Sequence, residues 1–156
     1  MKRIIAIIAL VTISASTMAG TAGTYTCSDK VKNVVTAGGQ KFTSTAYQTD
    51  QLILNQDGSM VMINLAFPDR PAGGTWSQSG NKVYLNPNYA DLARNAEYGC
   101  AVAGATCRFL GVTYSYKMTI DKNQTAMKGS NKINLTMLVN GELRTNNATL
   151  TTNCRK

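Results

Sequence analysis

Histidine is absent from this chain of 156 residues, and so are several other features on which catalysis commonly depends. Without histidine, the chain lacks the commonest general base, the usual partner of a serine or cysteine nucleophile, and the commonest metal ligand. It also contains no Cys-x-x-Cys pair, no glycine-rich phosphate loop and no calcium-binding loop. We therefore expect a protein that is not an enzyme and that carries neither a cofactor nor a metal.

Acidic residues are scarce, with 8 Asp and Glu against 16 Lys and Arg. Most of the acids fall in predicted turns, where an Asp side chain bonds to the nearby backbone, so we interpret them as solvated turn residues. A glycosidase-like carboxylate pair is the alternative. The eight acids are Asp29, Asp50, Asp57, Asp69, Asp91, Glu97, Asp121 and Glu142.

Long hydrophobic runs are also missing, because the apolar stretch from Ile4 to Val11 is too short to span a bilayer. It follows a basic start and precedes small residues, which is the order of a secretory signal peptide. We expect residues 1–19 to be a signal peptide cleaved after Ala19, with Ala22 as the second candidate and an uncleaved anchor as a further alternative. No cysteine lies beside the cleavage region, so a lipid anchor is not expected. These features predict a bacterial protein that is periplasmic or secreted and has no transmembrane span when mature.

The mature chain would still be basic, because loss of Lys2 and Arg3 leaves a net charge of 14 − 8 = +6. Its cations are dispersed, which favours a solubilising surface over a dedicated anion-binding face. An exported basic protein meets anionic envelope components rather than nucleic acid, so we expect no nucleic-acid partner.

Four cysteines are present, and in an exported chain they predict two disulfides rather than a metal site. Cys27 lies near the mature start and Cys154 near the end of the chain, whereas Cys100 and Cys107 share one stretch rich in Gly and Ala. We predict the pairs Cys27–Cys154 and Cys100–Cys107. The first pair would make the two terminal strands neighbours.

Alternation of apolar and polar residues predicts strands over most of the mature chain. The clearest strand is residues 110–120, and the segment 31–47 is weaker, with one or two irregular strands interrupted at Gly38-Gly39. Preferred hairpin turns occur at Asp57-Gly58, Ser79-Gly80-Asn81 and Asn140-Gly141. The last strand is expected over residues 142–154.

The predicted fold is all-β, with one domain over residues 20–156. A terminal disulfide favours an antiparallel up-and-down barrel of about eight strands, with a β-sandwich as the alternative. One insertion interrupts the strands. Residues 88–96 predict a short helix with Asn88 as its N-cap and Gly99 at its end, and residues 98–107 predict a small-residue loop held by the local disulfide.

Residues 52–85 carry a resemblance to a known family. Leu-Ile-Leu-Asn-Gln-Asp-Gly-Ser, then a strand, then Gly-Gly-Thr-Trp-Ser-Gln-Ser-Gly-Asn-Lys-Val-Tyr-Leu is similar to the repeated hairpins of small secreted bacterial lipocalin-like (calycin-type) barrels. The resemblance implies a barrel with a ligand cup, and it transfers no individual site residue.

Methionine and aromatic residues on the predicted inward faces are the candidates for lining such a cup. Flexible methionines fill cores, line adaptable apolar pockets or, in exported clusters, hold Cu(I), and we prefer these three interpretations in that order. The candidate ligand-binding residues are Met60, Met62, Trp76, Tyr114, Tyr116, Met118 and Met137.

Three functions follow as hypotheses. The first is an exported, non-enzymatic binding protein that holds a small apolar or amphipathic ligand in its barrel. The second is an interaction or inhibitor protein that presents residues 88–107 to another macromolecule. The third is a structural envelope protein with no pocket. The candidate contacts for the second hypothesis are Tyr89, Arg94, Tyr98 and Arg108.

The second hypothesis has a resemblance of its own. Tyr25-Thr26-Cys27 near the start and a cysteine near the end are similar to small barrel inhibitors of lysozyme, which implies an inhibitor. A positively charged chain would be repelled by a basic lysozyme, so its charge favours an anionic partner instead.

Overall fold

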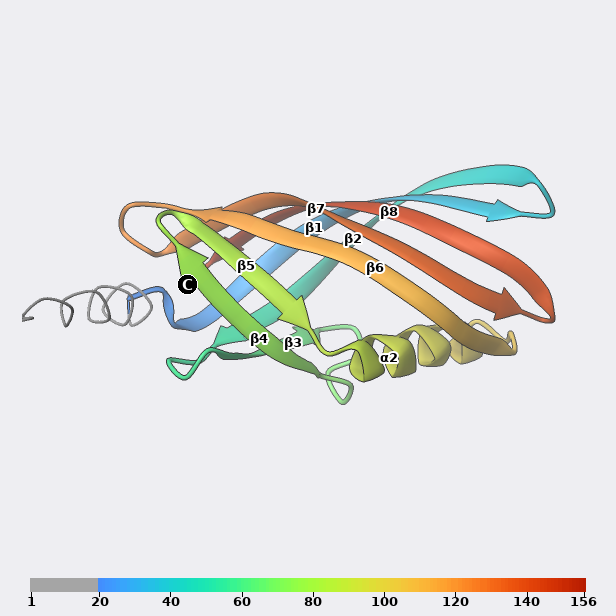
Figure 1. Ribbon diagram of the computed structural model, residues 1–156, viewed down its shortest axis with the longest axis horizontal. Coiled ribbons are helices and arrows are strands. Elements are labelled where there is room, and N and C mark those ends of the chain that lie inside the picture. Colours follow the sequence, from blue (N-terminus) through green and yellow to red (C-terminus); the bar gives the residue numbers. More distant parts are fainter. Residues whose placement is uncertain (1–19) are drawn as a thin grey trace, which may run out of the picture.

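Eight antiparallel strands form a closed barrel in the computed structural model, which describes residues 20–156 (Figure 1). Each strand pairs with the next one along the chain, and β1 pairs with β8. The strands are β1 (Gly23–Ala37), β2 (Gln40–Leu54), β3 (Ser59–Asn64), β4 (Ala72–Ser79), β5 (Lys82–Pro87), β6 (Cys107–Ile120), β7 (Ala126–Val139) and β8 (Glu142–Arg155). Helix α2 (Tyr89–Val102) lies between β5 and β6. The up-and-down barrel is therefore confirmed, and the sandwich alternative is wrong.

Both predicted disulfides are present. The register of β1 and β8 places Cys27 directly opposite Cys154, and the two are bonded across the seam that closes the barrel. The second bridge joins Cys100 on α2 to Cys107 at the start of β6. The predicted signal peptide, residues 1–19, lies outside the described residues. Between residues 20 and 156, no helix is long and apolar enough to cross a membrane.

Strand length divides the barrel into two parts. Strands β1, β2, β6, β7 and β8 have 14 or 15 residues, whereas β3, β4 and β5 have only 6 to 8. As a result, β2 pairs with β3 only over Asp50–Leu54, and β6 pairs with β5 only over Tyr116–Thr119. We call the part in which all eight strands pair the closed half. The rest, a curved sheet in the order β2-β1-β8-β7-β6, is the open half, and Figure 1 shows it extending beyond β3–β5.

The core fills the closed half. Alternate residues of each strand point inward, and the innermost of them are at most 4% exposed. Trp76 is anchored there because its indole N–H donates to the carbonyl of Asn55 at 2.8 Å. The most deeply buried apolar residues are Tyr25, Leu52, Leu54, Met60, Trp76, Val83, Met118, Ile120 and Met127.

Two local predictions need correction. The supposed break at Gly38-Gly39 is a tight hairpin turn with φ of 54° and 78°, so the two strands that it joins are long and regular. Helix α2 does not end at Gly99 but continues to Val102. Its C-cap is Ala103, and Gly104 closes the turn that follows, with a φ of 75° and an N–H that donates to the carbonyl of Ala101.

Candidate functional site

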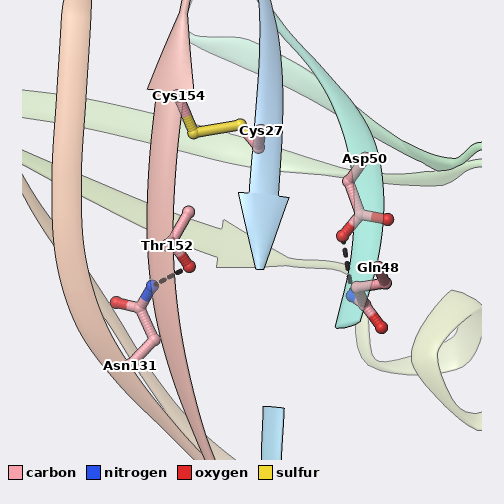
Figure 2. The surroundings of a disulfide bond; sticks show 6 residues. All are labelled: Cys27, Gln48, Asp50, Asn131, Thr152 and Cys154. Carbon is pink, nitrogen blue, oxygen red and sulfur yellow. Dashed lines mark hydrogen bonds between the residues drawn. A yellow bond between two sulfur atoms is a disulfide. The ribbon is translucent and has the colours of Figure 1, made fainter. Parts of the chain in front are cut away.

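A layer of buried polar side chains lies inside the barrel where the closed half meets the open half. It consists of Asp29, Asp50, Asn131 and Thr152, which are all between 1% and 7% exposed, and we call it the polar layer. Figure 2 shows three of them around the disulfide at the barrel seam. Strand register assembles the layer, because Asp50 lies opposite Cys27 and Asp29 lies opposite Thr152.

The interpretation of Asp29 and Asp50 as solvated turn residues is therefore wrong. Both lie within strands and point inward. Asp29 shares the buried face of β1 with Tyr25, Cys27 and Val31, as its parity in the sequence indicates. That parity is the signal that could have revealed it.

The carboxyl group of Asp50 is influenced by that of Asp29. Gln48 donates its amide N–H to Asp50 Oδ2 at 2.8 Å, but the Oδ1 atoms of Asp29 and Asp50 receive no hydrogen bond from an amide or hydroxyl donor. Burial raises the pKa of Asp50 to about 7, and the hydrogen bond with Asp29 and repulsion by its charge act in the same direction. The carboxyl group of Asp50 therefore takes up a proton at a higher pH than an exposed aspartate does.

The other side of the polar layer is fully hydrogen-bonded. Asn131 accepts a bond from the backbone N–H of Lys117 at 2.9 Å and donates to Thr152 Oγ1 at 3.2 Å, so it ties β6, β7 and β8 together (Figure 2). Tyr116 faces the same space, and burial followed by the charges of the two aspartates raises the pKa of its hydroxyl. Asn131 was not among the predicted site residues.

The space inside the barrel is small. The cavity beside the polar layer has a volume of about 20 Å³, which holds about one water molecule and is too small for an organic ligand. Its apolar lining includes Met62, Leu85, Tyr116 and Met118. Across residues 20–156, no three His, Cys, Asp or Glu side chains gather as a metal site would require.

The predicted cup residues divide between the core and its edge. Met60, Trp76, Tyr116 and Met118 belong to the core of the closed half, with Met62 and Tyr114 packed against it. The hydroxyl of Tyr114 donates to the carbonyl of Pro87 at 2.8 Å.

Met137 lies apart from that core cluster. It is buried in the open half, opposite Phe109 on β6 and Arg144 on β8. The structure therefore does not gather all seven predicted residues around one cavity.

A larger space lies on the inner face of the open half. This concave groove has a volume of about 560 Å³ and lies near the tips of β1, β2 and the start of β8. Its apolar surface comes from Val35, Ala37 and Phe42, and Phe42 is 55% exposed although it faces inward. The full lining is Val35, Ala37, Gly38, Gln40, Phe42, Glu142 and Arg144.

Charged groups border the concave groove at one end. Arg144 forms an ion pair with Glu142 at 3.2 Å, and both side chains are between 41% and 47% exposed. The Nε atom of Arg144 is buried and has no hydrogen-bond acceptor. The groove therefore combines an uncovered apolar surface with a partly exposed guanidinium.

The predicted interaction residues of α2 and β6 do not form one patch. Tyr89 packs edge-on against Phe109 with 5.2 Å between ring centroids. Arg94 pairs with Asp91 of the same helix at 2.9 Å, and Arg108 is exposed.

Tyr98 contacts two residues of the connection between β3 and β4. The guanidinium of Arg70 lies 3.6 Å from the centre of its ring, and Phe67 packs edge-on against it at 5.7 Å. Since these contacts occupy one face of α2, the helix is docked to the barrel and not displayed free of it.

Comparison with known proteins places the chain in no established family. No protein-family model and no curated protein matches it. Among solved structures, the chain is similar to the ywiB protein from Bacillus subtilis, with 10% identity and a TM-score of 0.30 over 82% of this chain and 92% of that one. A likeness this remote supports no conclusion about function. The eight-stranded barrel that the lipocalin-like resemblance implied is confirmed by the strand pairing, and membership of that family stays a prediction.

Proposed function

We propose that this is an exported, non-enzymatic binding protein that holds a small amphipathic ligand in the concave groove of the open half. The observation that carries the proposal is the exposure of Phe42, which is 55% uncovered on the inward face of a sheet. Binding sites are typically concave and apolar with a few polar groups, and Val35, Ala37 and Arg144 complete this description.

The charge of the groove favours an anionic head group on the ligand. The guanidinium of Arg144 is partly exposed, and its ion pair with Glu142 is therefore open to exchange for an anionic group. The chain as a whole carries an excess of cations, which would attract an anionic ligand from a distance. An aliphatic tail would lie along Val35 and Phe42, and a carboxylate or phosphate would contact Arg144.

Other surfaces fit the proposal less well. The cavity in the closed half holds about one water molecule, so a ligand cannot enter there without rearrangement of the core. A wider groove of about 890 Å³ crosses β8, β1 and β2 toward residues 64–67, but it lies on the outer face of the sheet, where Ser28, Thr49, Thr151 and Asn153 border the apolar side chains of Tyr47, Leu65 and Phe67.

Calorimetric titration with twelve-carbon amphiphiles below their micellar concentrations tests the proposal. We expect dodecanoate to bind more tightly than dodecyl maltoside, and dodecylamine to bind least. Phe42→Ser should weaken dodecanoate binding by at least about tenfold, because burial of a Phe side chain contributes about 1.5–3 kcal/mol. Arg144→Gln should remove the preference for dodecanoate over the maltoside.

Leu143→Ser is the matched control. Leu143 is also 55% exposed and lies in β8 next to Arg144, but its parity puts it on the outer face. We expect its substitution to leave the affinity unchanged. Equal losses in the Phe42 and Leu143 variants, or no binding of any amphiphile by the wild type, would contradict the proposal.

A further inference from the structure

Strand β2 has a long edge that no other strand covers. It pairs with β1 along its whole length, but with β3 only over Asp50–Leu54. Just before that segment, the carbonyl of Thr49 accepts a bond from the N–H of Leu65 at 3.0 Å. Residues 40–48 therefore have a neighbouring strand on one side only within the described part of the chain.

The bond from Leu65 also shows which backbone groups face outward along this edge. In an antiparallel strand, the N–H and C=O of alternate residues point to the same side. Because the carbonyl of Thr49 points away from β1, the backbone groups of Lys41, Thr43, Thr45 and Tyr47 do so as well. These donors and acceptors form an unfilled ladder along residues 40–48.

The opposite edge of the same sheet is covered. Helix α2 lies along β6, where Glu97 Oε1 accepts a bond from the backbone N–H of Phe109 at 2.8 Å, and the Cys100–Cys107 disulfide fixes the helix in place (Figure 1). Proteins usually protect edges with such a cover, or with prolines and charges. Residues 40–48 contain no proline and only one charged residue, Lys41.

We propose that the free edge of β2 pairs with the same edge of a second copy of this chain, antiparallel about a two-fold axis at Ser44. Two limits fix the register. The strand begins after the turn at Gly38-Gly39, and beyond Gln48 the carbonyl of Thr49 is already bonded. Only an axis through Ser44, the centre of residues 40–48, pairs all of that stretch on both copies.

This register is self-complementary in its hydrogen bonds and its side chains. It places Lys41 opposite Tyr47 of the second copy and Thr43 opposite Thr45, so outward-facing backbone groups meet in hydrogen-bonded pairs. On the outer face, each Lys41 meets an aromatic ring and not another cation. On the inner face, Phe42 lies opposite Ala46. The open halves of two copies would then form one continuous sheet, and the pairing does not depend on the proposed ligand.

Sedimentation equilibrium between about 1 µM and 1 mM measures the association, because this range covers the dissociation constants of weak to moderate complexes. Thr45→Pro is the diagnostic variant. The N–H of Thr45 points to the free edge, so proline removes no bond within one copy but blocks the ladder between copies. Thr45→Val keeps the N–H and is the matched control. We expect dimers for the wild type and Thr45→Val, and monomers with unchanged circular dichroism for Thr45→Pro.

A charge exchange tests the register. Tyr47→Lys would set two cations opposite each other and should raise the dissociation constant by at least about tenfold, a modest like-charge penalty. Adding Lys41→Glu to that variant should restore association. Hydrogen exchange gives a second readout, because the amides of Thr43 and Tyr47 should become protected with concentration, whereas that of Ser44 bonds to β1 in both states.

A wild-type chain that stays monomeric at 1 mM overturns the proposal and leaves the edge to a strand of another protein. A dimer of Thr45→Pro as tight as that of the wild type also overturns it, because the contact must then lie elsewhere. If adding Lys41→Glu to the Tyr47→Lys variant does not restore dimer formation, the proposed register is wrong.

Discussion

The buried carboxyl pair leads to an unusual expected dependence of stability on pH. An unfolded Asp titrates near 3.8, but the pKa of Asp50 in the folded protein is raised to about 7, chiefly by burial. Between these values the folded state holds a proton that the unfolded state has lost. The free energy of unfolding should therefore be highest below the unfolded pKa and fall by about 1.4 kcal/mol per pH unit as the pH rises toward the folded value.

From about pH 4.5 to pH 6.5 this amounts to a loss of about 2–3 kcal/mol, a large part of the stability of a small domain. Two other carboxyl groups, those of Asp57 and Asp121, have lowered pKa values and affect stability below this pH range. Hydrogen bonds from Ser59 lower the pKa of Asp57, and those from Ala126 and Thr125 lower the pKa of Asp121. Their stabilisation is present above the unfolded pKa and is lost only as the pH falls further.

Urea unfolding at fixed pH measures the effect, with both disulfides oxidised and the fluorescence of Trp76 as the probe. Asp50→Asn should flatten the pH dependence across this range, because it removes the titrating group and keeps the side-chain shape. Asp69→Asn, which changes a carboxylate that is 71% exposed, should leave the slope as in the wild type. A wild-type stability that is constant or rises from about pH 4.5 to pH 6.5 would refute the raised pKa of Asp50.

Two further predictions concern the disulfides and the glycines. Replacement of Cys27 and Cys154 by Ala should lower the free energy of unfolding by about 5 kcal/mol, because this bridge spans 127 residues of chain. Loss of the short bridge beside α2 should lower it by only about 2.5 kcal/mol. Urea unfolding measures both losses, and equal losses would contradict the loop-closure reasoning. Gly129→Ala should destabilise the protein by about 1–3 kcal/mol, because the added Cβ would lie 2.5 Å from the backbone oxygen of Lys117. Gly99→Ala should stabilise it by about 0.5–1 kcal/mol, because Gly99 lies in a helix with open space around it. Thermal melts that rank the two variants the other way would contradict the packing described.

Much of the fold could be predicted because its determinants are local. Alternation over residues 110–120 marks the inward face of β6, where Tyr116, Met118 and Ile120 are buried. The Asp57-Gly58 and Asn140-Gly141 turns fix two hairpins within a few residues. The Cys27–Cys154 bridge could be predicted because the two residues lie near the ends of a chain that we expected to be exported, and this bridge made the closed barrel the simplest arrangement.

The candidate site depends on properties that no short stretch of sequence contains. Asp29 and Asp50 become diagonal neighbours on the inner face only through the register of β1 and β2, which the turn at Gly38-Gly39 sets. A slip of one residue would have turned Asp50 to solvent.

The exposure of Phe42 has a similarly distant cause. Pairing between β2 and β3 ends at Asp50 and Asn64, so β2 has no neighbouring strand beside Phe42. The barrel therefore does not close over this side chain. Residue type and parity alone predict a buried aromatic at that position.

The pairing of the first strand with the last has a consequence for how the chain matures. A polypeptide that crosses a membrane N-terminus first presents Cys27, then Cys100 and Cys107, and Cys154 only at the end. Oxidation in order of appearance would join Cys27 to Cys100, which is not the native bond. If the chain is exported as we propose, correct maturation requires either that Cys27 stays reduced until the last strand has docked or that a thiol–disulfide isomerase exchanges the first bond. In the second case the yield of native protein depends on such an enzyme.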